Sequence, residues 1–313
     1  MMNEVIVFLA LIFAEMAAQR SWIAYMKQRH ISQVQKAYGT GIDAQVKEKV
    51  PSMGGMVFML IGSGLLLSAL ISGDRRAVLF WCYPLLSGAV GLTDDLLKYL
   101  RHSSEGLTSV RKFLLQVLTT ALWFTALALE GQVPALAGSL SWGGWIWPAA
   151  LFFAIGVQNA VNVTDGLDGL AAGGCALSFA VLMVLSPAGS AAFNGALAGC
   201  ALSLGFLWHN CHPAAVFMGD VGAHFLAGLM ASCALLGDGV LALIPAAFGF
   251  GIEMLSVVIQ LIAIHGWKRK VFKMSPIHHH FQLLGWPEDR IVVRFWLIHL
   301  LGACLCTALY QAF

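Results

Sequence analysis

Charged residues are scarce in this 313-residue chain, where Asp, Glu, Lys and Arg together make up only 11%. Soluble domains carry about 25% charged residues, whereas 59% of this chain is hydrophobic and its mean hydropathy is +0.78. That much apolar surface exceeds what a single soluble core can bury but suits a lipid bilayer. The formal net charge of +2 is too small for a nucleic-acid-binding surface, so we expect no nucleic-acid partner.

Several functional motifs are also missing. The seven cysteines show no C-x-x-C spacing, and most stand in apolar runs, which favours small core residues over a zinc or redox site. Neither G-x-x-x-x-G-K-[ST] nor H-E-x-x-H occurs, which argues against a P-loop ATPase and a zinc protease of that type. The N-terminus lacks the basic region of a signal peptide and favours a retained first helix.

Apolar stretches of membrane-spanning length fill most of the chain. About ten are expected, at approximately 5–25, 51–72, 77–93, 113–129, 145–163, 170–185, 191–208, 221–236, 240–264 and 291–313. The charge-free stretch 169–219 is divided at 186–190, where a proline and small residues predict a turn. We therefore expect an all-α integral membrane protein that forms one polytopic domain over residues 1–313.

The basic residues give an orientation. Fourteen of the 18 Lys and Arg residues fall in the first, third and ninth of the nine loops between these spans, while the even loops hold only Arg75 and Arg76. Because cytoplasmic loops carry the excess of Lys and Arg, the odd loops are expected in the cytoplasm. Both termini are then expected on the extracytoplasmic side.

Polar chemistry follows the same sidedness. Four odd loops carry the acidic, amide and histidine motifs, namely Asp94-Asp95, NAVNVTDGLDGLAAG (159–173), WHNCHPAAVFMGD (208–220) and PIHHHF (276–281). Aspartates are hard oxygen ligands of the kind that Mg²⁺ binds together with a substrate phosphate, and Lys and His side chains donate to phosphate. The pattern predicts one cytoplasmic active site for phosphoryl transfer.

Each feature has a plainer interpretation. Asp94 and Asp95 could pair with Lys98 on the same helix, and adjacent helical residues point about 100° apart, so both need not bind one metal. Asp165 and Asp168 could cap the next helix, the histidine run could be a surface tract, and Phe217 could pack in the core. Glu15 and Glu253 lie in apolar runs, where an acid is costly and is usually functional or paired.

Five strings carry a family resemblance. They are PSMGG (51–55), GLTDDLLK (91–98), NAVNVTDGLDGLA (159–171), FMGDVG (217–222) and PIHHHFQLLGW (276–286). In this order and in these loops, they resemble the polyprenyl-phosphate N-acetylhexosamine-1-phosphate transferase superfamily. Within this superfamily, the PIHHHF string resembles the motif of the muramoyl branch rather than that of relatives that use GlcNAc-1-phosphate. The chain departs from the family pattern at Val50, Val110 and His224, and Ser52 stands where threonine is usual.

The resemblance implies a fold of ten transmembrane helices in the bacterial cytoplasmic (inner) membrane. It also implies that the protein is usually a homodimer. It implies a Mg²⁺-dependent reaction in which UDP-MurNAc-pentapeptide and undecaprenyl phosphate, itself a membrane lipid, give lipid I and UMP. Two alternatives remain. One is a related transferase of GlcNAc-1-phosphate to polyprenyl phosphate. The other is a secondary transporter in which Glu15 and Glu253 act as coupling acids.

The resemblance also assigns roles to residues of this chain. Asp220 matches the metal ligand, and Asp94 and Asp95 match the acidic pair, with Asp94 expected to deprotonate the lipid phosphate. The histidine motif near the diphosphate corresponds to His278, His279 and His280, which complete the expected catalytic set. The expected substrate-binding residues are Lys47, Ser52, Lys98, Lys112, Asn162, Asp165, Asp168, Asn210 and Phe217, the last as an aromatic that stacks on uracil.

Overall fold

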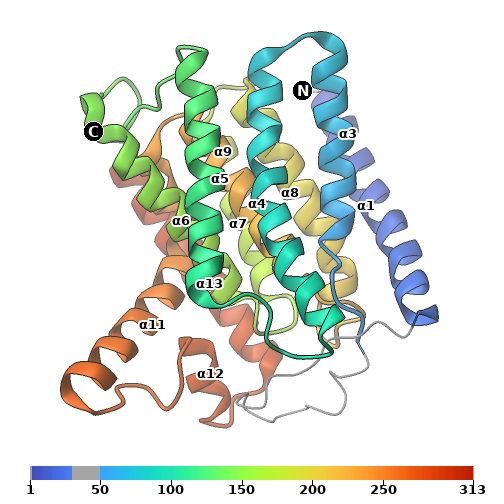
Figure 1. Ribbon diagram of the computed structural model, residues 1–313, viewed down its shortest axis with the longest axis vertical. Helices are drawn as coiled ribbons and strands as arrows, with labels where there is room; N and C mark the ends of the chain where they lie inside the picture. The colour runs from blue at the N-terminus through green and yellow to red at the C-terminus, as the bar shows by residue number, and fades with distance from the viewer. Residues whose placement is uncertain (1, 30–49, 313) are drawn as a thin grey trace.

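The computed structural model describes residues 2–29 and 50–312, and this part of the chain is mostly helical, with no β-strand (Figure 1). Ten long helices form the bundle: α1 (Met2–Gln28), α3 (Met56–Ser72), α4 (Arg75–Leu100), α5 (Ser109–Leu129), α6 (Ile146–Thr164), α7 (Leu170–Leu185), α8 (Ala191–Asn210), α9 (Gly219–Leu235), α11 (Phe248–Trp267) and α13 (Glu288–Gln311). Shorter elements are η1 (Gly143–Trp145), η2 (Val240–Ala242), α10 (Leu243–Ala246) and α12 (Ile277–Gln282).

Each long helix corresponds to one expected span, and the all-α membrane fold is confirmed. Seven of the described helices are long and apolar enough to cross a membrane, whereas α3, α7 and α9 are apolar but have only 16 or 17 residues. The outer helices expose large apolar side chains, such as Leu118, Leu122 and Leu129 along α5. Such surfaces suit lipid contact. A total of ten spans, and the side on which the termini lie, stay predictions.

The expected single helix over 240–264 is wrong. The chain instead forms η2 and α10, and α11 begins only at Phe248. Pro245 lacks the N–H that would continue the helical bonding. The N–H groups of Val240 and Leu241 donate to the carbonyls of Ala135 and Leu136 in another loop. The missing helical bonds are thus replaced by a loop contact.

Helix α9 lies at the centre of the bundle, and all its residues from 221 to 235 are buried (Figure 1). Glycines allow its neighbours to approach closely, because a Cβ on Gly55 would collide with the Gly222 backbone and a Cβ on Gly91 with the Asp220 backbone. The start of α9 is therefore held against both α4 and the loop that precedes α3.

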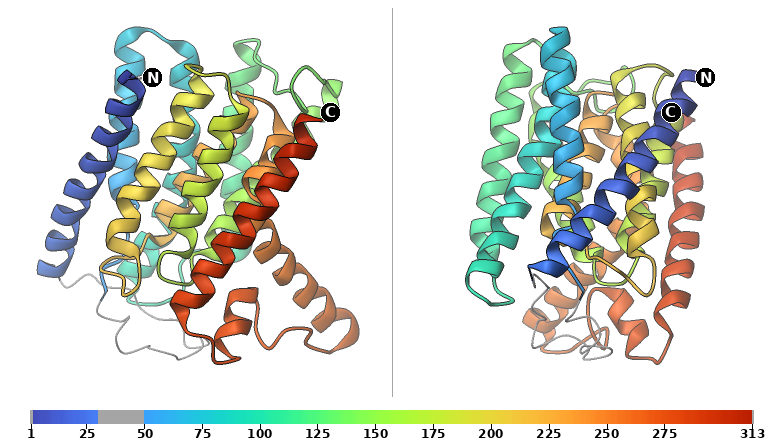
Figure 2. Two further views of the ribbon diagram at one scale, coloured as in Figure 1. Left: turned by 180° about the vertical axis from the view of Figure 1, so that it is seen from behind. Right: turned by 90° about the vertical axis from the view of Figure 1, so that its right-hand side faces the viewer.

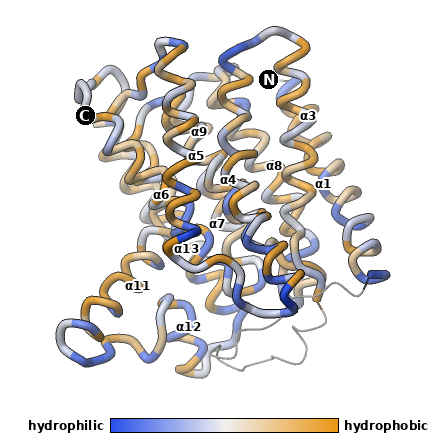
Figure 3. Tube along the Cα trace, in the orientation of Figure 1, coloured by the Kyte–Doolittle hydropathy of each residue, from blue (hydrophilic) through white to orange (hydrophobic). Residues whose placement is uncertain are grey.

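The bundle has two different ends. The last described residues of both termini lie at one end, and α12 lies at the other, together with the loops that follow α4, α6 and α8 (Figure 2). Hydrophilic residues gather at the α12 end, while hydrophobic colour dominates along the helices (Figure 3). The polar motifs that the sequence places in odd loops therefore share one end of the fold, which we call the polar end.

Candidate active site

Three aspartates meet at the polar end where α4 packs against α9. Asp94 and Asp95 come from the last turns of α4, and Asp220 opens α9. One carboxylate oxygen from each residue lies within 4.8 Å of the others. Asp94 and Asp95 are only 3% and 4% exposed. Buried carboxylates this close repel one another unless a positive charge or a proton lies between them.

Two lysines supply that charge. The Lys98 ammonium lies 2.6 Å from Asp94, 3.6 Å from Asp95 and 3.0 Å from Asp220. Lys112, in the first turns of α5, lies 2.6 Å from Asp220. The pairing of Asp94 and Asp95 with Lys98 occurs as the plainer interpretation expected, and the same ammonium also reaches Asp220. The cluster thus joins three helices.

Backbone contacts explain how adjacent aspartates serve one cluster. Asp95 turns toward α9 and accepts a 3.0 Å hydrogen bond from the Val221 N–H. Asp94 turns toward the α4–α5 loop and accepts a 2.7 Å bond from the Leu107 N–H. Gly219, with φ of 72°, allows the chain to enter α9 beside the Asp95 carboxylate. The two side chains point apart, yet both remain near Lys98.

An amide extends the cluster toward α6. Asn162 donates a 2.9 Å hydrogen bond to Asp220, and its oxygen accepts a 3.3 Å bond from Lys112. The next acid, Asp165, follows the end of α6. Burial, together with the charges of Asp220 and Asp95, raises the pKa of its carboxyl to about 7. The last turn of α6 therefore adds an amide to this cluster, and the α6–α7 loop adds an acid whose pKa is raised.

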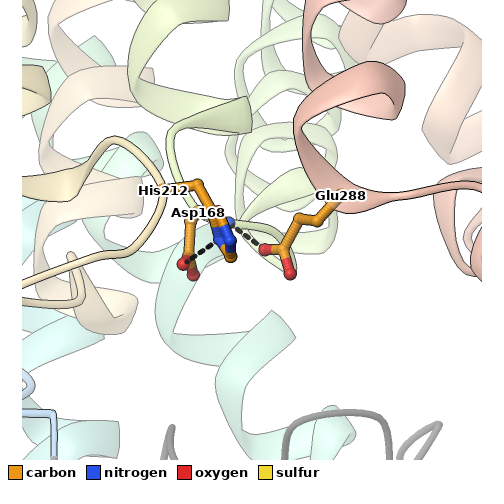
Figure 4. A group of neighbouring side chains, drawn as sticks. All are labelled: Asp168, His212 and Glu288. Atoms are coloured by element: carbon orange, nitrogen blue, oxygen red, sulfur yellow. Dashed lines mark hydrogen bonds and ion pairs between the residues drawn. The ribbon is translucent and has the colours of Figure 1, made fainter.

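A second polar group surrounds Asp168 in the same loop. Asp168 accepts hydrogen bonds from the His212 ring nitrogen at 3.0 Å and from the Ala214 N–H at 3.1 Å. The Asp168 N–H donates to Glu288 at the start of α13. Figure 4 shows these three side chains converging from three different segments. Asn210 completes the group by accepting from the Gly169 N–H and donating to the Val216 carbonyl.

The three histidines of α12 have different surroundings. His278 is fully buried, and its Nδ1 lies 3.1 Å from Glu253 of α11. Its Nε2 faces Gly166, beside Asp165, and His279 Nε2 lies on the same side. His280 instead accepts a 3.0 Å hydrogen bond from the Lys273 N–H and packs against Phe272. Two of the three rings therefore reach the α6–α7 loop.

Phe217 and Ser52 lie in two loops that pair with each other. Phe217 donates its N–H to the Pro51 carbonyl at 2.8 Å and accepts from Gly54 at 2.9 Å. Its side chain is half-buried, whereas Ser52 is buried. Lys47 lies outside the described residues. Apart from it, the structure brings the expected residues to the polar end, around the α6–α7 loop and the start of α9.

The donor set can hold a metal ion. Asp94, Asp95 and Asp220 offer hard oxygen atoms of the kind preferred by Mg²⁺. The Lys98 ammonium already places a cation where these acids converge. Lysine and metal could thus share the role of neutralising the cluster, and the residues present fit a hard divalent ion.

Comparison with known proteins points to one family. Residues 77–238 match the family model of glycosyl transferase family 4. The chain is 38% identical to the phospho-N-acetylmuramoyl-pentapeptide-transferase of Halalkalibacterium halodurans over 273 residues, or 83% of each chain. It is 39% identical to that of Geobacillus kaustophilus, covering 83% of this chain and 84% of the relative.

A third relative, from Rubrobacter xylanophilus and named in the same way, is 35% identical across 96% of this chain and 95% of its own. The chain belongs to the phospho-N-acetylmuramoyl-pentapeptide-transferase family. It is therefore a transferase, and the expected muramoyl branch is confirmed.

Against this family background, the sequence interpretation missed two polar residues. His212 and Glu288 contact Asp168, but His212 was only one letter in a longer string, and Glu288 follows the last matching motif. His224, a departure from the family pattern, belongs to a buried polar network, where its ring lies 3.3 Å from Gln158, which donates to Tyr83. The spacing of these residues along the chain predicts neither the group around Asp168 nor the network around His224.

Proposed function

We propose that this chain transfers phospho-MurNAc-pentapeptide from UDP-MurNAc-pentapeptide to undecaprenyl phosphate, giving lipid I and UMP. A phosphate oxygen of the lipid attacks the sugar-linked phosphorus, and the bond from that phosphorus to the UMP oxygen breaks. One observation carries the proposal: Lys98 and Lys112 both contact Asp220, so two cations and a carboxylate meet where a diphosphate can be clamped.

The acidic pair provides the base. Asp94 is our choice for the group that accepts a proton from the lipid phosphate, because its Oδ2 faces Lys98 inside the cluster while Oδ1 is held by the Leu107 N–H. Asp95 is tied to the start of α9 and fixes the position of its neighbour Asp220. A fixed base beside a cationic clamp meets the positioning needs of phosphoryl transfer.

Asp220 is the proposed ligand for Mg²⁺, because its carboxylate converges with those of Asp94 and Asp95 and its side chain is partly exposed. Bound there, the ion would neutralise charge on the diphosphate. Lys98, Lys112 and Asn162 hold Asp220 in place on the remaining sides. Their role is to orient the carboxylate and to bind phosphate oxygens directly.

The nucleotide is expected beside the α6–α7 loop. We assign uracil stacking to Phe217 and polar contacts to the set formed by Ser52, Asn162, Asp165, Asp168 and Asn210, together with Lys47. His278 and His279 face the loop from α12 and are suited to donate to the diphosphate. His280 accepts a hydrogen bond from the Lys273 N–H and acts on the site by holding α12 in position.

The remaining proposals concern the membrane setting of the protein. The lipid substrate enters from the membrane with its head at the polar end, which we place in the cytoplasm of a bacterium, with both termini outside. The protein is proposed to be a homodimer in the inner membrane.

The direct test of the substrate is an assay with purified protein, polyprenyl phosphate and Mg²⁺. UDP-MurNAc-pentapeptide and UDP-GlcNAc are supplied in parallel reactions, and UMP release is measured. We expect UMP only from the muramoyl donor. Release from UDP-GlcNAc alone would assign the chain to the GlcNAc-1-phosphate branch instead.

A further inference from the structure

Helix α1 carries a buried polar pair although it lies at the edge of the bundle (Figure 2). Its buried residues are Glu15, Gln19, Ile23 and Met26, which form one stripe along the helix. Glu15 and Gln19 are both fully buried. An acid and an amide within an apolar span are costly unless they make specific contacts. The pair therefore calls for a partner inside the fold.

That partner is the loop before α3. The Gln19 amide has two oxygen acceptors beside it, and its nitrogen donates to the Gly54 carbonyl at 3.1 Å and to Glu15 Oε1 at 3.1 Å. Gln19 precedes the end of α1 at Gln28 by about 14 Å of helix. The described residues just before α3 thus contact α1 well inside that helix rather than at its end.

The peptide group that links Gly54 and Gly55 is held on both sides. Its carbonyl accepts from Gln19, and its N–H donates to the Met218 carbonyl at 2.9 Å. The preceding Gly54 N–H donates to the Phe217 carbonyl at 2.9 Å. Two consecutive peptide groups therefore connect the polar pair on α1 to Phe217 and Met218, which stand just before Gly219 and Asp220.

Packing alone does not require this pair. Helix α1 already lies against α8, because Glu15 methylenes and the Ile12 carbonyl lie where a Cβ on Gly205 would be. The His209 ring also lies 3.1 Å from the Met16 carbonyl. The Gln19 contact extends past α8 to the Gly54 loop. It adds a hydrogen bond to the backbone that positions Phe217.

We propose that Glu15 and Gln19 are positioning residues. Glu15 orients the Gln19 amide, and Gln19 holds the segment 51–55, which in turn is hydrogen-bonded to residues 217 and 218. The assignment rests on the proposed function, because it takes Phe217 as the contact of the nucleotide donor. Asp220 has its own contacts to Lys98, Lys112 and Asn162. Loss of the pair should therefore weaken donor binding more than turnover.

The test measures KM and kcat for both substrates in the full chain. Gln19→Met keeps the side-chain length and removes the donor, so we expect the donor KM to rise about tenfold, with kcat within about threefold and the lipid KM unchanged. Glu15→Met should behave likewise, and the double variant should add little, because both act through one contact. Glu15→Gln keeps an oxygen acceptor and should restore a donor KM near wild type.

Ser21→Ala, on an exposed part of α1, serves as the control. Thermal unfolding in detergent monitors the fold of each variant. An unchanged donor KM in folded Gln19→Met would overturn the proposal, as would Glu15→Gln being as impaired as Glu15→Met. If Gln19→Met does not purify, the two Glu15 variants decide. A wild-type protein without UMP release would contradict the proposed function instead, so the two failures are distinguishable.

Discussion

The Lys112 ammonium lies 2.6 Å from the carboxylate of Asp220, a residue 108 positions further along the chain. This contact ties α5 to α9 and leaves Asp220 between two lysines. We expect Lys112→Met to lower kcat about 100-fold or more, because one preorganised cation is lost from the diphosphate site. Lys98 still contacts Asp220, so the fold should persist.

Lys270→Met is the matched control for that prediction, since it makes the same substitution at an exposed lysine of the α11–α12 loop. Its rate should stay close to wild type. Near-normal turnover of Lys112→Met would show that Lys112 takes no part in the chemistry. Lys98 would then be the lysine that acts beside Asp220.

Phe217 provides a second prediction. Stacking of a base on an aromatic ring contributes about 1–3 kcal/mol in protein–nucleic acid complexes, which corresponds to roughly 10- to 100-fold in affinity. Phe217→Ala should raise the donor KM by that factor and leave lipid affinity unchanged, whereas Phe217→Tyr should retain the ring and most of the affinity. A selective loss of lipid affinity in Phe217→Ala would place this side chain at the lipid-binding surface.

The Asp165 carboxyl makes stability and metal binding depend on pH. Burial and the charges of neighbouring acids raise the pKa of its carboxyl from 3.8 to about 7. The folded, metal-free protein thus binds more protons than the unfolded chain between about pH 4 and pH 7, and this group's contribution to stability falls as pH rises through that window. Mg²⁺ favours the charged carboxylate, so metal binding at pH 7 should release protons.

Calorimetry of Mg²⁺ binding in two buffers of different ionisation enthalpy measures this release. We expect more protons at pH 7 than at pH 8.5, and fewer from Asp165→Asn than from wild type. Equal proton release at both pH values, or an unchanged release from Asp165→Asn, would show that Asp165 is not coupled to the metal site.

The interpretation of sidedness can be tested with single cysteines on a background without the seven native ones. Glu105→Cys lies in the α4–α5 loop at the polar end, and Ala188→Cys lies in the α7–α8 loop at the opposite end. We expect impermeant thiol reagents to label Glu105→Cys only from the cytoplasm and Ala188→Cys only from outside, with or without substrate. Labelling of Glu105→Cys from outside when substrate is added would favour the transporter alternative.

Much of this arrangement could be predicted from the sequence, because apolar length and charge distribution act locally. Helix α7 begins and ends at the expected residues, 170 and 185. The break near Pro245 was missed because it depends on backbone bonds to residues 135 and 136, far away in the chain. Periodicity carries no information about such partners.

The same limit applies to the site. Motifs indicated Asp94, Asp95 and Asp220, yet their meeting depends on Gly91, which lets α4 approach the backbone of α9. His212 and Glu288 join Asp168 only after three segments fold together. Residue types predicted the chemistry, whereas tertiary packing determined which side chains share it.

The central claim, that a phosphosugar moves from the nucleotide to the lipid, is tested most directly by following the phosphorus. UDP-MurNAc-pentapeptide carrying ³²P in the sugar-linked phosphate is incubated with undecaprenyl phosphate, Mg²⁺ and purified protein. We predict that the label enters the lipid fraction and that the released nucleotide is unlabelled UMP. Asp220→Asn should transfer none, since an amide is a poor ligand for a hard cation, while Asp74→Asn at the opposite end should remain active. Label recovered in released UDP would mean transfer of the sugar alone and would contradict this account.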